Sequence, residues 1–358
     1  MATNDFLVWA PGGGNVMSQG AYSTNTFLTN GVVTGLADNT LYNKSVRQSS
    51  IMAATIANFI IQELNLNVVD DGTTATILTN FTNALLKLTS TVTRIKLTAN
   101  TTFYVSTTGN DSNNGLTPGT AFLTLQALVN YLYLKYDFGG YQVVIQLLDG
   151  TYTGAGFPSA FVGQIIPLIL AGNSSTPANV QLVSSGSNSN TISCFNNASV
   201  IVSYMGLSSS GIGYGGYALN ASGGGSINIG AGITFGACVS SHMIASLGGR
   251  ILLANVGYSI SAAAPFHYAA ISGGQINIDG SQVGGITVTL AGGLNFSTAF
   301  ATANSNGTVN TLGVTYSGSA TGSKYTASLN GVINTFGGGG AGFPGSTAGT
   351  TFLGGQVS

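Results

Sequence analysis

A short glycine-led phrase recurs through the C-terminal half of this 358-residue chain. Residues 225–229 read Gly-Ser-Ile-Asn-Ile, and four later copies keep the Gly followed by alternating apolar residues. The five copies begin at Gly225, Gly249, Gly274, Gly307 and Gly331. The steps between them are therefore 24, 25, 33 and 24 residues, and a looser copy, residues 198–202, lies 27 residues before the first. Periods of this length are typical of stacked solenoids.

The composition of the repeats favours a right-handed parallel β-helix over other solenoids. A leucine-rich repeat would need its Leu and Asn signature, and helical repeats would need Glu, Lys and Arg, which are almost absent here. We expect each copy to supply one strand to each sheet, with the Gly setting the bend, and adjacent coils about 4.8 Å apart. The 33-residue step should carry a longer loop, around residues 282–303.

The N-terminal part has a different pattern, which predicts two helices. The first should start near Ser49 or Ser50, which are good N-caps, and the second near Thr73 or Thr74. Their apolar residues recur at three- and four-residue steps, which places them on one face of each helix. Neither helix can bury its stripe alone. An intrachain helical hairpin and an intersubunit bundle both satisfy this requirement.

The open end of a β-helix is a row of unpaired backbone groups, so it needs a cover. A short strand at residues 103–105 and a loop at 110–115 precede a third predicted helix, residues 122–135. We expect this helix to cap the N-terminal end of the coils. The predicted organisation is a helical module at 1–98, an initial strand and capping helix at 99–136, the β-helix at 137–336 and a Gly-rich tail at 337–358.

Charge and cysteine usage exclude several classes of protein. Charged residues make up 5% of the chain and the net charge is −1, which gives no electrostatic attraction to nucleic acid phosphates. No signal peptide is visible, and the apolar stretches are shorter than the roughly 18 residues of a membrane span. We therefore expect no nucleic acid partner and no membrane insertion. Cys194 and Cys238 are expected to be small buried thiols.

Two segments resemble the pectate-lyase-like β-helices of bacteriophage tailspikes. Residues 104–116 read Tyr-Val-Ser-Thr-Thr-Gly-Asn-Asp-Ser-Asn-Asn-Gly-Leu, and residues 121–128 read Ala-Phe-Leu-Thr-Leu-Gln-Ala-Leu. In that family the pattern marks the first strand, a loop and the capping helix, in agreement with the prediction from the residues alone. The resemblance implies a homotrimer, which the coils by themselves would not establish.

Two further segments are similar to phage proteins. Residues 42–50, Tyr-Asn-Lys-Ser-Val-Arg-Gln-Ser-Ser, and residues 53–60 resemble the N-terminal module of tail fibres, which is implied to lie on the virion side. Residues 325–335, 337–340 and 343–350 are similar to a Gly-rich ending of short phage β-helix proteins. Together the resemblances cover about a third of the chain.

The acidic residues offer a weak case for an enzyme. Glycoside hydrolysis needs two carboxylates about 5–9.5 Å apart. After residue 100 the acids are Asp111, Asp137, Asp149 and Asp279. Asp111 is expected to hold an Asx-type turn, and the Asp-Gly pairs at 149 and 279 are typical of turns. We predict no catalytic residue and no cofactor, although a carboxylate pair formed across subunits stays possible.

Histidines and tyrosines in the coils are the candidate binding residues. His242 and His267 each lie seven residues before the Gly of their repeat, so they should stack one coil apart. They could form a polar ladder for a sugar, or they could be loop or surface histidines; two His without a nearby acid or Cys are poor metal ligands, so no metal site is predicted. Aromatic side chains can stack on sugar rings or pack in the core. The predicted binding residues are Tyr214, Tyr217, Tyr258, His242, His267 and Tyr268.

Three hypotheses about function follow. The first is a homotrimeric tail fibre or tailspike component, made in the host cytoplasm and located in the virion tail, which binds other virion proteins through its N-terminal part and a host surface glycan through the β-helix. The second is a polysaccharide depolymerase with an intersubunit carboxylate site. The third is a purely structural tail or baseplate adaptor.

Overall fold

The computed structural model describes residues 3–4, 8–9, 15–30, 38–71, 73–92, 94–337 and 339–358. The chain divides after Arg94 into two compact units, Met1–Arg94 and Ile95–Ser358. The division lies four residues before the predicted boundary at residue 98. The two units are described separately below.

The first unit is helical. Its elements are α1 (Gln19–Ser23), α2 (Phe27–Asn30), α3 (Asn39–Leu64) and α4 (Ala75–Val92). The predicted start of α4 is confirmed to within two residues, but the predicted start of α3 near Ser49 is wrong. The Asp38 carboxylate caps α3 by accepting the amide protons of Thr40 and Leu41. Ser49 and Ser50 lie inside the helix, where their hydroxyls donate to carbonyl oxygens of the preceding turn.

Helices α3 and α4 pack on each other within the chain. Ala57, Ile60 and Val68 form a small buried cluster, and Phe59 contacts Phe81 edge to face with ring centroids 5.9 Å apart. Apolar side chains remain exposed on both helices, among them Ile51, Met52 and Ile56 on α3 and Leu78 and Leu85 on α4. The intrachain hairpin is therefore present, and it leaves an apolar surface uncovered in the single chain.

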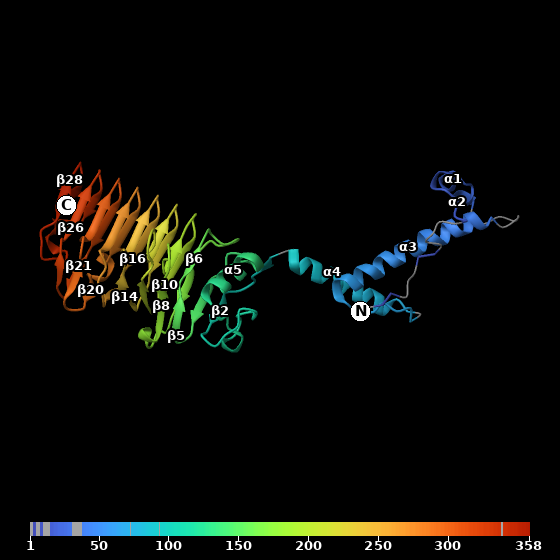
Figure 1. Ribbon diagram of the computed structural model, residues 1–358, viewed down its shortest axis with the longest axis horizontal. Coiled ribbons are helices and arrows are strands. Elements are labelled where there is room, and N and C mark those ends of the chain that lie inside the picture. Colours follow the sequence, from blue (N-terminus) through green and yellow to red (C-terminus); the bar gives the residue numbers. More distant parts are fainter. Residues whose placement is uncertain are drawn as a thin grey trace. The chain divides into compact units, whose positions relative to one another are not determined.

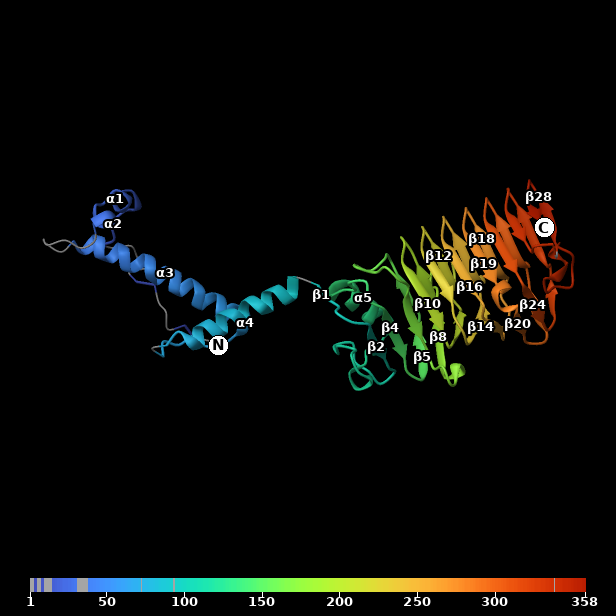
Figure 2. The same cartoon turned by 180° about the vertical axis from the view of Figure 1, so that it is seen from behind.

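The second unit is a right-handed parallel β-solenoid of about eight turns (Figure 1). Every strand pair in its three long sheets is parallel, and from β4 to β26 each coil visits the three sheets in turn before it returns to the first. Sheet 1 has ten strands, sheet 2 has seven and sheet 3 has eight. The same stack of coils is visible from behind in Figure 2. The predicted mainly β fold with a small helical module is confirmed.

The strands follow in spatial order within each sheet. Sheet 1 contains β2 (Thr101–Val105), β4 (Val143–Leu147), β7 (Leu168–Ala171), β10 (Ser199–Ser203), β13 (Ser226–Ile229), β16 (Arg250–Ala254), β19 (Gln275–Asp279), β23 (Thr308–Leu312), β27 (Val332–Asn334) and β29 (Gln356–Val357). Sheet 2 contains β5 (Gly150–Thr153), β8 (Val180–Ser184), β11 (Met205–Ser209), β14 (Ile233–Cys238), β17 (Tyr258–Ile260), β20 (Ile286–Leu290) and β24 (Val314–Ser317). Sheet 3 contains β6 (Ala155–Phe157), β9 (Ile192–Cys194), β12 (Tyr217–Ser222), β15 (Ser241–Ser246), β18 (Phe266–Ile271), β22 (Ala299–Asn304), β26 (Tyr325–Ser328) and β28 (Thr350–Phe352).

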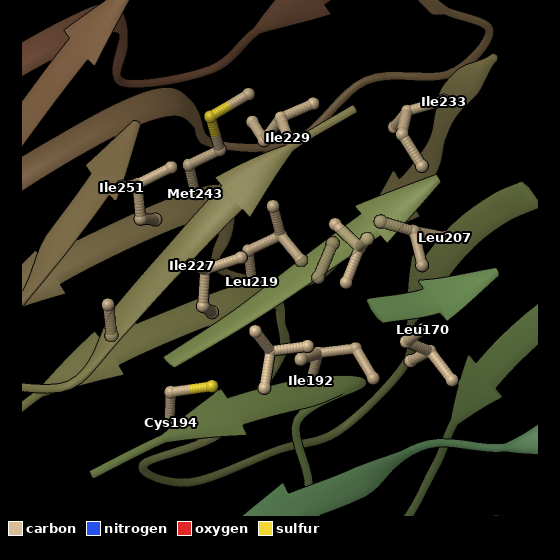
Figure 3. Close-up of a cluster of buried hydrophobic side chains, with 14 of the residues drawn as sticks. Leu170, Ile192, Cys194, Leu207, Leu219, Ile227, Ile229, Ile233, Met243 and Ile251 are labelled. Atoms are coloured by element: carbon tan, nitrogen blue, oxygen red, sulfur yellow. The ribbon is translucent and has the colours of Figure 1, made fainter. Parts of the chain in front are cut away.

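The glycine-led copies lie side by side in sheet 1, as predicted. The second residue after the Gly of each copy is aligned across the coils in the order Ile227, Ile251, Ile276, Val309, Ile333. These side chains are buried and belong to one continuous core. Figure 3 shows aliphatic side chains of the three sheets meeting in the interior, with Cys194 among them. Cys194 and Cys238 are free and buried, which confirms their prediction as buried thiols.

The repeated Gly is required by a close approach of two coils. A Cβ atom at Gly249, Gly274 or Gly331 would lie 2.1–2.2 Å from the carbonyl oxygen of Ala221, Ala245 or Ala303, a residue of the preceding coil. No side chain fits at that distance. The predicted role of the Gly in the bend is thus explained by contact between coils.

The repeat contains one more copy than the sequence analysis found. Gly355 has the same close approach, 2.1 Å from the Ala327 carbonyl oxygen, and it precedes β29. β28 pairs with β26, and β29 pairs with β27. The predicted end of the β-helix at residue 336 is therefore wrong, because most of the Gly-rich tail forms a further coil.

The long 33-residue step contains more strand than predicted. It includes the turn η3 (Ser281–Val283), β20, and β21 (Leu294–Phe296), which pairs with β25 (Ala320–Gly322) in a separate two-stranded ladder. The extra residues of this coil therefore form a strand, β21, that pairs with β25 of the next coil. The other short elements are β1 (Ile95–Lys96), which pairs with β3 (Tyr136–Asp137), and the turns η1 (Pro118–Thr120), η2 (Pro177–Asn179) and η4 (Gly339–Gly342).

The capping helix is confirmed. α5 (Leu125–Lys135) lies at the N-terminal end of the coils, and it buries Leu125, Leu128, Val129 and Leu132 against the core (Figure 1). The helix begins after Thr124 and not at the predicted Phe122. Phe122 instead covers the edge of β2, where its backbone exchanges hydrogen bonds with Tyr104 and Ser106.

We predict that Gly274→Ala lowers the free energy of unfolding by roughly 1–3 kcal/mol, the usual range for overpacking a tightly packed site. The added methyl would overlap the Ala245 carbonyl oxygen and force the two coils apart. Denaturant unfolding measures the change. Gly156→Ala is the matched control, because a Cβ there meets nothing within 4 Å. Equal stability of the two variants would contradict the packing argument.

Candidate functional site

Asp111 joins its loop to the two residues just before α5, whose N-cap is Thr124. Its carboxylate accepts the amide protons of Leu123 and Thr124 at 2.9 and 2.8 Å, and the Thr124 hydroxyl donates to it at 2.9 Å. The predicted structural role is confirmed, but the contact joins the loop to the helix start rather than forming a local Asx turn.

The carboxylates of the other three solenoid acids also accept hydrogen bonds from residues of the surrounding loops and turns. Asp149 accepts hydrogen bonds from the side-chain amides of Asn173 and Asn179, which lower the pKa of its carboxyl. Asp137 accepts the Gly139 amide proton. Asp279 accepts the Ser281 amide proton, and hydrogen bonds from Ser281 lower the pKa of the Asp279 carboxyl.

Asp279 lies several coils away from the other three acids. It ends β19, whereas Asp111 precedes α5 and Asp137 and Asp149 flank the first strands of the solenoid. Each carboxylate accepts hydrogen bonds from neighbouring residues, so we assign all four a structural role. Among the described residues, no group of three or more His, Cys, Asp or Glu side chains is arranged to bind a metal ion.

The six predicted binding residues divide into an accessible pair and a buried group. Tyr214 is 90% exposed in the loop between β11 and β12, and Tyr217 is half-buried at the start of β12. His242, His267, Tyr258 and Tyr268 are buried. The prediction that these four could contact a ligand at the surface is wrong, and so is the alternative that the histidines lie in loops or at the surface.

The buried group forms a continuous hydrogen-bonded network with Tyr316. His242 Nε2 is 3.0 Å from the Gly236 carbonyl oxygen, and His242 Nδ1 is 2.8 Å from His267 Nδ1. His267 Nε2 is 2.7 Å from the Tyr258 hydroxyl, which is 2.5 Å from the Tyr268 hydroxyl. Tyr316 donates to Tyr268 at 3.3 Å. We call these five side chains the His–Tyr network; the expected one-coil spacing of the two histidines is confirmed.

The geometry assigns every proton in this network. The Gly236 carbonyl only accepts, so His242 Nε2 carries a proton and, in the neutral ring, His242 Nδ1 accepts. His267 Nδ1 must then donate, and its Nε2 accepts from Tyr258. The two neutral histidines therefore hold opposite tautomers, and all hydrogen bonds run in one direction from Tyr316 to Gly236.

Burial keeps both histidines neutral. Desolvation lowers the pKa of His242 to about 4, and desolvation together with the nearby His242 lowers the pKa of His267 well below its usual value. Desolvation also raises the pKa of Tyr258, Tyr268 and Tyr316. The network is thus an uncharged polar part of the core with all its members paired, the condition under which buried polar groups are tolerated.

An open groove of about 410 Å³ crosses the outer face of sheet 2. Thr234, Ser259 and Thr289 occupy aligned positions on β14, β17 and β20 and form a row of hydroxyls along it. Gly232 and Gly257 leave the space beside this row empty. A Cβ at Gly257 would lie 2.4 Å from the Thr287 carbonyl oxygen, so no side chain can extend from this position over the row.

The groove is lined without any charged side chain, with Pro177 and Ala178 among its lining residues. The sequence analysis missed it, because the repeats were aligned on the sheet 1 strand alone. Aligning Thr234, Ser259 and Thr289 would have required the register of sheet 2, whose coils differ in length.

Comparisons with known proteins found no matching family, no matching curated protein and no matching solved structure. Within the described parts of the chain, no helix combines the length and hydrophobicity needed to cross a membrane.

We predict that Asp111→Ala destabilises the solenoid by roughly 1–2 kcal/mol, because it removes the charged acceptor of three hydrogen bonds that position the start of α5. The variant removes the acceptor of the Leu123 and Thr124 amide protons. Asp111→Asn keeps an amide oxygen at the same place and should retain most of the stability. The midpoint of denaturant unfolding checks both. An alanine variant as stable as the unmodified protein would show that these hydrogen bonds are dispensable.

We predict that the free energy of unfolding falls as pH drops from 7 to 4. An unfolded histidine binds its proton near pH 6.5, whereas folded His242 binds it only near pH 4. Between these values the unfolded chain holds more protons, so acid favours unfolding. A shift of this size is worth about 3 kcal/mol for His242, and His267 adds to it. Denaturant unfolding at pH 7, 5.5 and 4.5 measures the slope; a flat profile down to pH 5 would contradict the burial of the histidines.

Proposed function

We propose that this chain is a homotrimeric component of a bacteriophage tail fibre or tailspike, which attaches to other virion proteins through its helical unit and binds a neutral host surface glycan through its solenoid. The observation that carries the proposal is the pairing, in one chain, of a charge-poor parallel solenoid with a helical unit that leaves apolar side chains uncovered. The phage resemblance of residues 104–128 and 42–60 supports the same proposal.

The helical unit favours assembly with further copies. Its buried cluster consists of Ala57, Ile60 and Val68 with a few partly buried neighbours, which is a small core for its length. Met52 and Ile56 on α3, and Leu78 and Leu85 on α4, are exposed at steps of four and seven residues. Such stripes are typical of helices that associate with neighbours. Trimerisation of the chain would cover them.

The surface chemistry of the solenoid favours a neutral sugar as ligand. Sugars offer hydroxyls at their edges and apolar ring faces, which match a row of hydroxyls and an exposed aromatic ring. The groove supplies the row at Thr234, Ser259 and Thr289, and Tyr214 supplies the exposed ring. The solenoid acids already accept hydrogen bonds within turns and caps, so binding without cleavage is the activity we propose.

The test combines assembly, glycan binding and glycan cleavage on the purified full chain. We expect sedimentation equilibrium to give the mass of a trimer, and a panel of host-type polysaccharides to yield at least one ligand without release of reducing ends. Tyr214→Ala and the groove-blocking Ser259→Trp should each be tried against that ligand, and at least one should weaken binding tenfold or more. Tyr141→Ala, at an exposed aromatic of another coil, is the matched control and should leave binding unchanged.

Each alternative has its own outcome. Release of oligosaccharides would replace the proposal with a depolymerase whose carboxylates meet between subunits. A trimer that binds no polysaccharide would favour a structural adaptor. A monomer at micromolar concentration would contradict the assembly on which the proposal depends.

A further inference from the structure

The His–Tyr network connects two sheets across several coils. Gly236 on β14, Tyr258 on β17 and Tyr316 on β24 belong to sheet 2, while His242 on β15 and His267 and Tyr268 on β18 belong to sheet 3. Backbone ladders join coils within a sheet, but only side chains and turns join one sheet to the next. The network is therefore a cross-sheet contact in the middle of the solenoid.

The surroundings of the two histidines offer no charge that could balance a proton. The rings packed against them come from β14, β17, β18, β21 and β22, and they are Phe235, Tyr258, Tyr268, Phe296 and Phe300. The titratable groups that face the histidines are each other and the tyrosines of the network. No Asp, Glu, Lys or Arg of the described chain contacts either ring.

Counting protons shows what the network can accept. In the neutral state each of the five side chains carries one proton toward the next acceptor. One added proton can be accommodated at His242, because His242 Nδ1 then donates to His267 Nδ1 and every bond beyond it reverses direction. His267 Nε2 would donate to Tyr258, Tyr258 to Tyr268, and Tyr268 to Tyr316.

A second added proton cannot be accommodated by reversing the hydrogen bonds. Both histidines would then carry a proton on Nδ1, and these atoms are 2.8 Å apart. The hydrogen bond would be replaced by two like charges with opposed N–H groups in an apolar core. The contact must break, and the rings must separate or reach water.

We propose that the His–Tyr network is an acid-sensitive switch, which holds β14, β15, β17 and β18 together while it is neutral and opens this part of the solenoid when both histidines are protonated. Strand β17 is the weak element, since it has three residues and only two register partners on β14. β17 also carries Ser259 of the groove and directly follows Gly257, so opening would reshape that surface. The inference itself does not depend on the proposed function.

Hydrogen exchange followed by mass spectrometry at pH 7 and pH 4.5, corrected for intrinsic exchange rates, tests the switch on the full chain. We expect the protection factors of residues 233–271 to fall by roughly a hundredfold or more. At pH 4.5, which is about two units below the ordinary histidine pKa, protonation of each released histidine favours the open form by about a hundredfold. Residues 143–184, in earlier coils, should keep their protection. A uniform loss along the solenoid would overturn the proposal.

The matched variant is H242Q/H267Q, whose side-chain amides can reproduce the direction of the hydrogen bonds and cannot take up a proton. It should lose the acid response of residues 233–271. Tyr316→Phe removes the far end of the network, keeps both histidines and should retain the response. The same acid response in the glutamine variant and in the unmodified protein would refute the switch.

A spectroscopic measurement keeps the proposal testable if the glutamine variant does not fold. With 15N-labelled histidine, the unmodified protein at pH 7 should give two neutral rings of opposite tautomers, Nε2–H for His242 and Nδ1–H for His267. Both should become protonated together with the loss of protection. Two rings of the same tautomer, or rings that titrate near pH 6.5 in the folded protein, would overturn the inference.

Discussion

The parallel hydrogen-bonded ladder between coils is the interaction on which the rest of this structure depends. It brings the backbone of each coil so close to the next that, before every sheet 1 strand from β13 onward, only a glycine fits under the carbonyl oxygen of the preceding coil. The same closeness aligns Ile227, Ile251 and Ile276 into one core row. A charge-poor chain can fold this way because its polar backbone groups are paired by the ladder itself.

The ladder also explains why the buried His–Tyr network and the surface groove share strand β17. On strand β17, the Tyr258 side chain points inward to His267, whereas Ser259 and the preceding Gly257 face the groove. Alternation along a strand makes one short segment serve both faces. A change in the buried histidines is therefore expected to reach the groove through a single strand.

Prediction from the sequence succeeded where the local pattern allows only one structural role for a residue. We could predict the recurring glycines, the alternating strands after them and the amphipathic helix before the coils without knowing which residues they contact. Prediction failed where neighbours decide the outcome. Ser49 is as good a cap as Asp38, and only the actual path of the chain places it inside α3. His242 and Tyr268 lie in strands that are buried on both faces, so alternation could not tell inside from outside.

The sequence by itself determined the solenoid, its sheet 1 register and its capping helix, because these follow from local periodicity and from the exclusion of a Cβ at the repeated glycine. The tertiary structure alone decided the direction of the His–Tyr network and the position of the hydroxyl groove. Both arise from side chains of different coils that meet only after stacking, and coil lengths that vary from 24 to 33 residues conceal that alignment in the linear sequence.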